Sequence, residues 1–396
     1  MFFIICFLKE NHFMKYTLII DGHNFLFRSL YVLPQKKGRK LLSDEESRKL
    51  FVSKLSQNLN AVMREMKPLV DRCVITLDSR SWRNDIESDV EYKGTRNQDD
   101  VIDWDGFREC MNQFVSESEK FNITVSKTNS AEADDLIFMW SSALNAKNFP
   151  VIIYTSDKDM LQLVSSNSSG CDVILWSDVT KKLYVPDNFS EIVKNDSTSF
   201  MESFMKGSGT VDIYDRFANL EQCARKRKLE KIATDNVRFT YLKVLVGDKS
   251  DNISSIYSYE KNGRVYNVTE AKAEKILENY MGKTGELNME CLFVDDALSV
   301  LANSCVETVK GAEYETVLKN IKRNIKYMVL SKRVIPEDVT ERITADIKNL
   351  AKSMKRIDFS KVSESDEPVI KKTESVFSGT ETSDMSFIKK SEKTLF

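Results

Sequence analysis

Residues 17–24 read TLIIDGHN, a short apolar run that ends in Asp21. Two later runs of the same design lead into Asp78 and Asp157: RCVITL at 72–77 and VIIYT at 151–155. These runs lack the alternation of a half-exposed strand, so each predicts a strand buried on both faces of a parallel sheet. Ligands of such sheets bind outside the carboxyl ends of the strands, and we expect the three aspartates to lie there.

Helical periodicity separates the predicted strands. Apolar residues recur at the spacing of one helix face in Glu46–Met66, Phe107–Phe121 and Glu132–Leu144. Strand and helix in alternation predict an α/β fold with a doubly wound parallel sheet. Further periodic segments, Asn236–Val246 and Thr269 to about Leu350, predict a second, helical region.

Acidic residues recur in five clusters along the first two-thirds of the chain: Asp21; Asp78; Glu132, Asp134 and Asp135; Asp157 and Asp159; Asp248 and Asp251. Gathered carboxylates repel one another, and a fold tolerates them chiefly when a cation neutralises them. Oxygen ligands of this kind suit Mg²⁺ or Mn²⁺. A plainer alternative for the third cluster is that its acids are ordinary first-turn residues of a helix capped by Ser130.

Cations and aromatic residues alternate after Asp78, in DSRSWRNDIESDVEYKGTRN at 78–97. Such a mixture can hold a phosphate backbone and stack an unpaired base. Acids in the same segment nearly balance the cations, however, and charge alone favours a solvated surface segment.

Composition excludes several classes of function. The 396 residues are 41% hydrophobic and 30% charged, with a net charge of −2, which is typical of a soluble globular protein. Phe2–Leu8 is too short to cross a bilayer, and Met14 is a plausible alternative start. Seven cysteines without CxxC spacing argue against a disulfide framework or zinc site and fit a reducing, cytosolic setting. Only two histidines are present, His12 and His23, which nearly excludes catalytic triads that need a histidine base. The sequence has no GxxxxGK(S/T) loop, which excludes a phosphate-loop ATPase.

Six motifs in order resemble those of the 5′-nuclease family: IIDGHN, LDSRSWR, EYKGTR, AEADDL, TSDKDMLQL and GDKSDN. This family includes flap endonucleases and the 5′-exonuclease domains of bacterial DNA polymerases. Within the family, the sequence most resembles the T-even phage ribonuclease H type, and the stretch DWDGF at 103–107 adds to this likeness. The resemblance covers roughly residues 15 to 290. It implies a PIN-like α/β fold with a mostly parallel central sheet flanked by helices, a helical arch at about 79–100, and a C-terminal helix-hairpin-helix-like region.

The resemblance also implies roles for individual residues. Two Mg²⁺ ions, for which Mn²⁺ can substitute, would be held by Asp21, Asp78, Glu132, Asp134, Asp157, Asp159, Asp248 and Asp251, with Asp135 as an outer-shell neighbour. The implied catalytic residues are Lys93, Arg96, Asp134 and Asp157. The implied substrate-binding residues are Arg80, Trp82, Arg83, Tyr92, Lys93, Arg96, Lys272 and Lys275.

The function implied is a Mg²⁺-dependent 5′→3′ exonuclease and flap endonuclease with ribonuclease H activity. It would be a phage-encoded monomer in the host cytoplasm that removes RNA primers and 5′ flaps during lagging-strand replication. Its substrates would be DNA and RNA–DNA hybrids, and its partners a sliding clamp, bound through EKTLF at 392–396, and a single-stranded DNA-binding protein. Two alternatives stay open: a PIN-like single-strand ribonuclease and a non-catalytic structure-specific DNA-binding relative.

The expected organisation follows from these patterns. It comprises an N-terminal extension at 1–13, a nuclease domain at 14–190, an insertion at 191–231, a helical DNA-binding region at 232–355 and a disordered tail at 356–396. One departure from the family lies after GDKSDN, where the usual Gly-x-Gly hairpin is absent.

Overall fold

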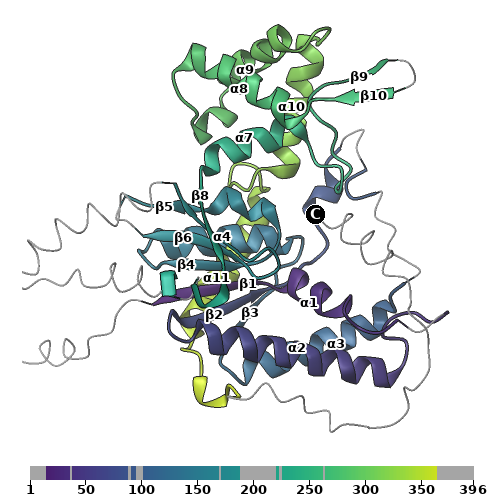
Figure 1. Cartoon of the computed structure of the whole chain (residues 1–396), viewed down its shortest axis with the longest axis vertical. Helices are drawn as coiled ribbons and strands as arrows, with labels where there is room; N and C mark the ends of the chain where they lie inside the picture. Colours follow the sequence, from purple (N-terminus) through teal and green to yellow (C-terminus); the bar gives the residue numbers. More distant parts are fainter. Residues whose placement is uncertain are drawn as a thin grey trace, which may run out of the picture.

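The central sheet runs through the middle of the molecule in the order β3-β2-β1-β4-β6-β7-β8, with β5 paired to β6 (Figure 1). The computed structural model describes residues 15–35, 38–87, 91–94, 101–168, 171–187, 220–222, 225–261 and 264–363. Neighbours from β3 to β6 are parallel, β7 is antiparallel to β6, and β8 is parallel to β7. The strands are β1 (Tyr16–Asp21), β2 (Val70–Thr76), β3 (Thr124–Ser126), β4 (Val151–Tyr154), β5 (Ser165–Ser166), β6 (Asp172–Ser177), β7 (Lys182–Pro186) and β8 (Glu230–Thr234).

The predicted buried strands are confirmed. All six residues of β1 are buried, and β1 lies between β2 and β4. Leu18 and Ile20 face one hydrophobic core, whereas Ile19 faces the other. Burial on both faces therefore explains why this run does not alternate.

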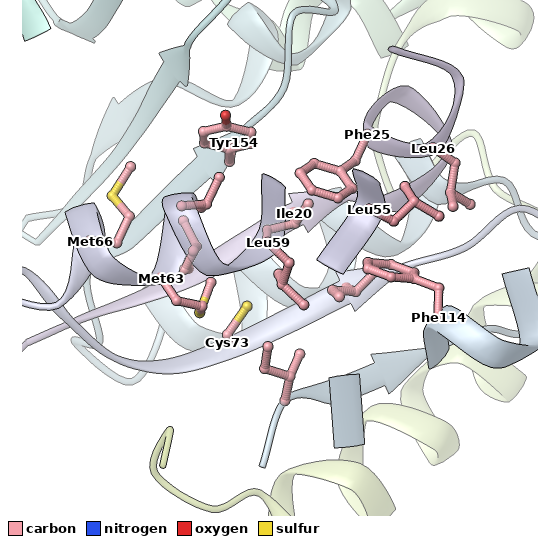
Figure 2. Packing of buried hydrophobic residues seen from close by; sticks show 14 of the residues in the cluster. Ile20, Phe25, Leu26, Leu55, Leu59, Met63, Met66, Cys73, Phe114 and Tyr154 are labelled. Atoms are coloured by element: carbon pink, nitrogen blue, oxygen red, sulfur yellow. The ribbon is translucent and has the colours of Figure 1, made fainter. Parts of the chain in front are cut away.

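Helices cover both faces of the sheet, as the α/β prediction requires. On one face lie α1 (Gly22–Leu30), α2 (Glu45–Met66) and α3 (Trp104–Glu119). Figure 2 shows Leu55, Leu59 and Met63 of α2 packed with Ile20 and Cys73 of the sheet. On the other face lie α4 (Ala133–Asn145) and α11 (Glu337–Ser353).

A second unit of helices stands beside the sheet, with its own hydrophobic core (Figure 1). It contains α7 (Asn236–Val246), α8 (Glu270–Thr284), η4 (Met289–Phe293), α9 (Asp295–Thr308) and α10 (Tyr314–Met328). Between α7 and α8 the chain forms an antiparallel hairpin of β9 (Ser258–Lys261) and β10 (Arg264–Asn267). This hairpin stands in the region that was predicted to resemble a helix-hairpin-helix.

The structure differs from the expected organisation at three places. Strand β8 begins in the segment expected to be an insertion, and it extends the sheet beyond residue 190. Helix α11 lies in the segment expected to be the helical DNA-binding region, but it packs on α4 and β3 because its apolar residues Val339 and Ile343 complete the second face of the sheet. Ile357 is buried against the first face, and η5 (Phe359–Lys361) follows it, within the segment predicted as the tail.

Several expectations fall outside the described residues: the extension at 1–13, most of the insertion at 191–231, the tail from 364 onward and much of the predicted arch. Of the arch segment, the structure gives the 3₁₀ helix η2 (Trp82–Asp85) and residues 91–94. In the described part of the chain, no helix combines the length and the apolar character needed to cross a membrane.

Candidate active site

Four predicted acids come together at the carboxyl ends of the central strands. Asp21 ends β1, Asp78 and Asp157 follow β2 and β4, and Asp134 lies in the first turn of α4. Burial, with repulsion from Asp157 and Asp78, raises the pKa of Asp21 to about 7. Burial and then repulsion from Asp157 and Asp21 raise the pKa of Asp134. The carboxylates are therefore close enough to oppose one another's charge.

Two hydrogen bonds fix the position of the Asp21 carboxylate. Its Oδ1 accepts from the backbone N–H of Asn24 at 3.0 Å, and its Oδ2 accepts from the hydroxyl of Thr155 at 2.8 Å. The same Thr155 oxygen accepts from the backbone N–H of Asp157 at 3.0 Å. One threonine thus joins the ends of β1 and β4 and sets the spacing of two acids.

Asp78 is held by neighbours on both sides. Its Oδ1 accepts from the backbone N–H of Ala133, at the start of α4, at 2.6 Å. Its own backbone N–H donates to Nδ1 of His23 at 3.0 Å. Burial lowers the pKa of His23, which keeps this ring nitrogen available as an acceptor. His23 therefore has a structural contact at the site and no proton to give from that nitrogen.

A second group of acids surrounds Lys243 of α7. Its ammonium group contacts the carboxylate of Asp159 and lies 3.1 Å from Oδ2 of Asp248. The Lys243 side chain is only 10% exposed. Burial alone would raise the pKa of Asp248. Lys243 and hydrogen bonds from Ser250 outweigh burial and hold this pKa below its usual range. Burial raises the pKa of Asp157, Lys243 opposes the rise, and repulsion from Asp251 and Asp248 adds to it, so the two acidic groups lie next to each other.

Lys243 is a site residue that the sequence prediction missed. The available signal was a single cation inside the apolar helix segment TYLKVLV at 240–246, because a lysine in such a position needs a buried partner. The turn that follows needs Gly247, whose φ is 77°. A Cβ at this glycine would lie 2.6 Å from the carbonyl oxygen of Ile253.

Glu132 is surrounded by donors from the predicted arch segment. Its Oε2 accepts from Arg83 Nη1 and from the Tyr92 hydroxyl, each at 3.0 Å, and its Oε1 contacts the Lys93 ammonium. Burial alone would raise the pKa of Glu132, but Lys93 and Arg83 outweigh it and hold the pKa below its usual range. Glu132 is therefore charged and already neutralised by the chain's own cations.

Trp82 and Arg83, which are predicted to bind substrate, are both buried in the structure. Arg83 is 2% exposed and bonds to both carboxylate oxygens of Asp135, at 3.0 and 2.9 Å. Its Nε donates to the carbonyl of Tyr327 at 2.9 Å, and Trp82 donates to Asp135 at 3.0 Å. Because the buried acid needs these donors, the pair serves the fold and leaves no group for a phosphate.

Lys93 lies where the two acidic groups meet. Its backbone, with φ at 57°, donates to the carbonyl of Asp251 at 3.0 Å. Its charge opposes the rise in the pKa of Asp134 and of Asp157. The backbone of residue 91 is also held, because Asn252 donates to its carbonyl at 3.0 Å. The described end of the arch is thus attached to the GDKSDN turn beside the acids.

The other predicted contacts are more scattered. Arg80 is exposed and pairs with Asp85. Lys272 is half-buried and Lys275 is exposed, both on α8 of the helical unit. Arg96 lies outside the described residues.

The donor set suits a hard divalent cation. Among the described residues, no three His, Cys, Asp or Glu side chains lie at ligand spacing. The carboxylates of Asp21, Asp78, Asp134 and Asp157 nevertheless oppose one another's charge in a largely buried setting. A bound cation would remove that cost, and oxygen-only donors favour Mg²⁺ or Mn²⁺. Glu132, Asp159 and Asp248 are instead partnered by Arg83, Lys93 and Lys243.

Comparison with known proteins gives the same family as the motifs. Residues 16–194 match the model of the 5′-3′ exonuclease N-terminal, resolvase-like domain. DNA polymerase I of Lactococcus lactis subsp. lactis is 26% identical over 72% of this chain and 28% of its own length. A 5′-3′ exonuclease of Mycoplasma pneumoniae is 27% identical over 45% of this chain and 58% of its own length. The match thus covers under a third of the length of the two Lactococcus lactis polymerases.

Solved structures show a weaker likeness. T5 5′-exonuclease with bound zinc has 16% identity and a TM-score of 0.49, over 85% of this chain and 100% of that one. The catalytic core of Rad2 in complex with DNA substrate has 10% identity and a TM-score of 0.33, over 85% and 93%. These scores add no argument of their own, and the assignment rests on the sequence match. Over residues 16–194, the chain is therefore similar to the 5′-nuclease family.

Proposed function

We propose that this protein is a divalent-metal-dependent nuclease that cleaves phosphodiester bonds at 5′ ends and flaps. The observation that carries the proposal is the group of mutually repelling carboxylates at the carboxyl ends of β1, β2 and β4, with Lys93 beside them. The match of residues 16–194 to a 5′-3′ exonuclease domain supports the same reaction class. The 5′-3′ exonuclease of Mycoplasma pneumoniae is one relative whose name states this activity.

The chain's own residues would divide the work. Asp21, Asp78, Asp134 and Asp157 would hold one Mg²⁺. Asp159, Asp248 and Asp251 would serve a second, in place of the Lys243 ammonium group that now contacts Asp159 and Asp248. The chemistry supplied by bound Mg²⁺ would be an activated water and stabilisation of the leaving oxygen. Lys93 would place positive charge where negative charge develops on the phosphate. Thr155 and Asn24 would keep Asp21 in place without reorganisation during the reaction.

A finer proposal concerns substrate and context. Ribonuclease H activity on RNA–DNA hybrids, removal of primers and flaps in lagging-strand replication, and a phage origin with action in the host cytoplasm are inferred from the motif resemblance alone. The same holds for a sliding clamp bound through EKTLF, a single-stranded DNA-binding protein as a second partner, and substrate contacts of Arg80, Tyr92, Arg96, Lys272 and Lys275.

A cleavage assay tests the proposal. The full chain is incubated with a 5′-flap DNA and with a 5′-labelled RNA–DNA hybrid, in Mg²⁺ and in EDTA. We expect cleavage only with Mg²⁺, and loss of at least about a hundredfold in rate for Asp134→Asn and Asp157→Asn. Exposed Asp105→Asn, on α3, is the matched control and should cleave normally.

The outcomes separate the alternatives. Wild-type turnover by both variants would contradict the acidic centre. Cleavage of single-stranded RNA without a need for a 5′ end would favour the PIN-like ribonuclease. Flap binding without cleavage in Mg²⁺ or Mn²⁺ would favour the non-catalytic relative, in which Lys243 keeps the place of a cation.

A further inference from the structure

The β9–β10 hairpin carries a row of stacked tyrosines. Its register places Tyr259 directly opposite Tyr266, and their ring centroids are 5.2 Å apart with planes 13° apart. Tyr257 continues the row, with its ring centroid 6.3 Å from that of Tyr259. Figure 1 shows this hairpin extending to one side of the helices of the second unit.

The two paired rings are exposed to solvent. Tyr259 and Tyr266 are each 42% exposed. A cross-strand aromatic pair stabilises a two-stranded hairpin, which would be marginal alone, and this explains one pair of rings. Tyr257 is half-buried, packs against the core of the helical unit and donates its hydroxyl to the carbonyl of Gly311, so its position has a structural cause. Neither role explains the exposed Arg264, which lies two residues before Tyr266 and so on the same face. The tyrosine face, defined as Tyr257, Tyr259, Tyr266 and Arg264, combines ring surfaces with a cation.

The base of the hairpin is fixed close to the candidate active site. Arg323 of α10 donates to the carbonyl of Ser254 at 3.0 Å, and Asn320 donates to the carbonyl of Ile256 at 2.9 Å. The six residue-to-residue steps from Asp251 to Tyr257 span at most about 22 Å, since an extended chain covers about 3.3–3.6 Å per residue. Lys319 and Lys326 are exposed on the same helix, α10, and add positive charge. A nucleic-acid strand leaving the acids is thus within reach of the tyrosine face.

We propose that the tyrosine face binds unpaired bases of single-stranded nucleic acid, at a site separate from the acidic centre. Rings stack on bases of any sequence, and Arg264 can pair with the connecting phosphates. The choice of nucleic acid over a protein partner rests on the cation within the row and on the exposed lysines of α10, the helix that holds the base of the hairpin. The proposal depends on the proposed function only in that the substrate is a nucleic acid.

Binding assays in EDTA test the proposal without cleavage. Fluorescence anisotropy of the full chain is measured with a labelled thymidine oligonucleotide, with an abasic oligonucleotide of equal length, and with a blunt duplex. The double variant Tyr259→Ile/Tyr266→Ile keeps the preference for strand structure and removes the flat rings. Val265→Thr, on the opposite face of the hairpin, is the matched control.

Stacking predicts a specific pattern. The double variant should bind the thymidine oligonucleotide about tenfold more weakly, with duplex affinity unchanged. Wild-type protein should prefer the thymidine to the abasic strand, and the double variant should lose that preference, whereas a role only in folding would weaken both equally. Arg264→Gln should weaken the binding of both oligonucleotides and reduce the dependence of the affinity on salt concentration.

Unchanged affinity of the double variant for the thymidine strand would overturn the proposal. If that variant also shifts from dimer to monomer in sedimentation, the face is instead a contact between two copies of the chain. Failure of the proposed function is distinguishable, because it is seen as absent cleavage in Mg²⁺ whatever the strand affinity.

Discussion

The ring of Tyr92 stacks on the ring of Tyr327, with centroids 5.4 Å apart and planes 25° apart. The Tyr92 hydroxyl donates to Glu132 at 3.0 Å, so this side chain joins the start of α4 to the end of α10. Burial, followed by repulsion from Glu132, raises the pKa of Tyr92, and the hydroxyl keeps its proton as a donor. Lys93 is the next residue, and its position therefore depends on a helix far along the sequence.

Loss of the stack should impair the placement of Lys93. An aromatic pair contributes about 0.5–1.5 kcal/mol beyond the area that it buries. Tyr327→Ala should therefore reduce kcat for flap cleavage by about tenfold, with a smaller effect on KM, while Tyr327→Phe keeps the ring and most of the activity. Steady-state kinetics of both variants measure this. Equal activity of the two would show that the ring does not support Lys93.

Removal of Arg83 should destabilise the fold. Arg83→Met leaves the carboxylates of Asp135 and Glu132 without their buried partner, and breaking a buried pair costs about 3–5 kcal/mol in free energy of unfolding. Urea unfolding followed by circular dichroism measures the loss. Arg80→Met, at an exposed pair with Asp85, should cost less than about 1 kcal/mol. If both variants unfold at the same urea concentration, the network around Asp135 does not stabilise the protein.

Lys243→Met should make stability depend on divalent cations. Lys243 is the cation that Asp159 and Asp248 share. Because the variant leaves both carboxylates charged without it, the free energy of unfolding in EDTA should fall by about 3 kcal/mol. Mg²⁺ should restore more stability to this variant than it adds to the wild type, as thermal unfolding in both conditions can measure. Exposed Lys249→Met, in the following turn, is the control and should change little. A loss that Mg²⁺ fails to recover would contradict this reading.

Stability without metal should fall as pH rises toward neutrality. The pKa of Asp21 is about 7 in the folded protein against 3.8 for an ordinary aspartate, so the folded state binds the proton more tightly than the unfolded chain. The free energy of unfolding therefore declines between about pH 4 and pH 7 in EDTA. Mg²⁺ should raise Tm by several degrees at about pH 7.5 and by much less at about pH 5, where protons already neutralise the acids. Equal shifts at both pH values would contradict the shared cation site.

Local patterns were enough to predict the sheet and the position of its acids. The residues of β1 are buried on both faces, so their sequence lacks alternation, and the residue that follows such a strand lies at the ligand-binding edge. The apolar periodicity of Asn236–Val246 likewise gave α7 with its observed bounds. These features depend on neighbours along the chain, which a single sequence displays directly.

The sequence by itself determined the α/β fold, the aspartates at the strand ends and, through its motifs, the resemblance to the 5′-nuclease family. Only the tertiary structure decided which cation partners which acid. Arg83 looks like a surface residue in its own segment, yet it is buried because Asp135 and the carbonyl of Tyr327, 244 positions away, surround it. Lys243 pairs with Asp159 across 84 positions, and Tyr92 meets Tyr327 between different units. Such pairings depend on how whole elements pack, and burial then determines whether a charge faces solvent or an acid.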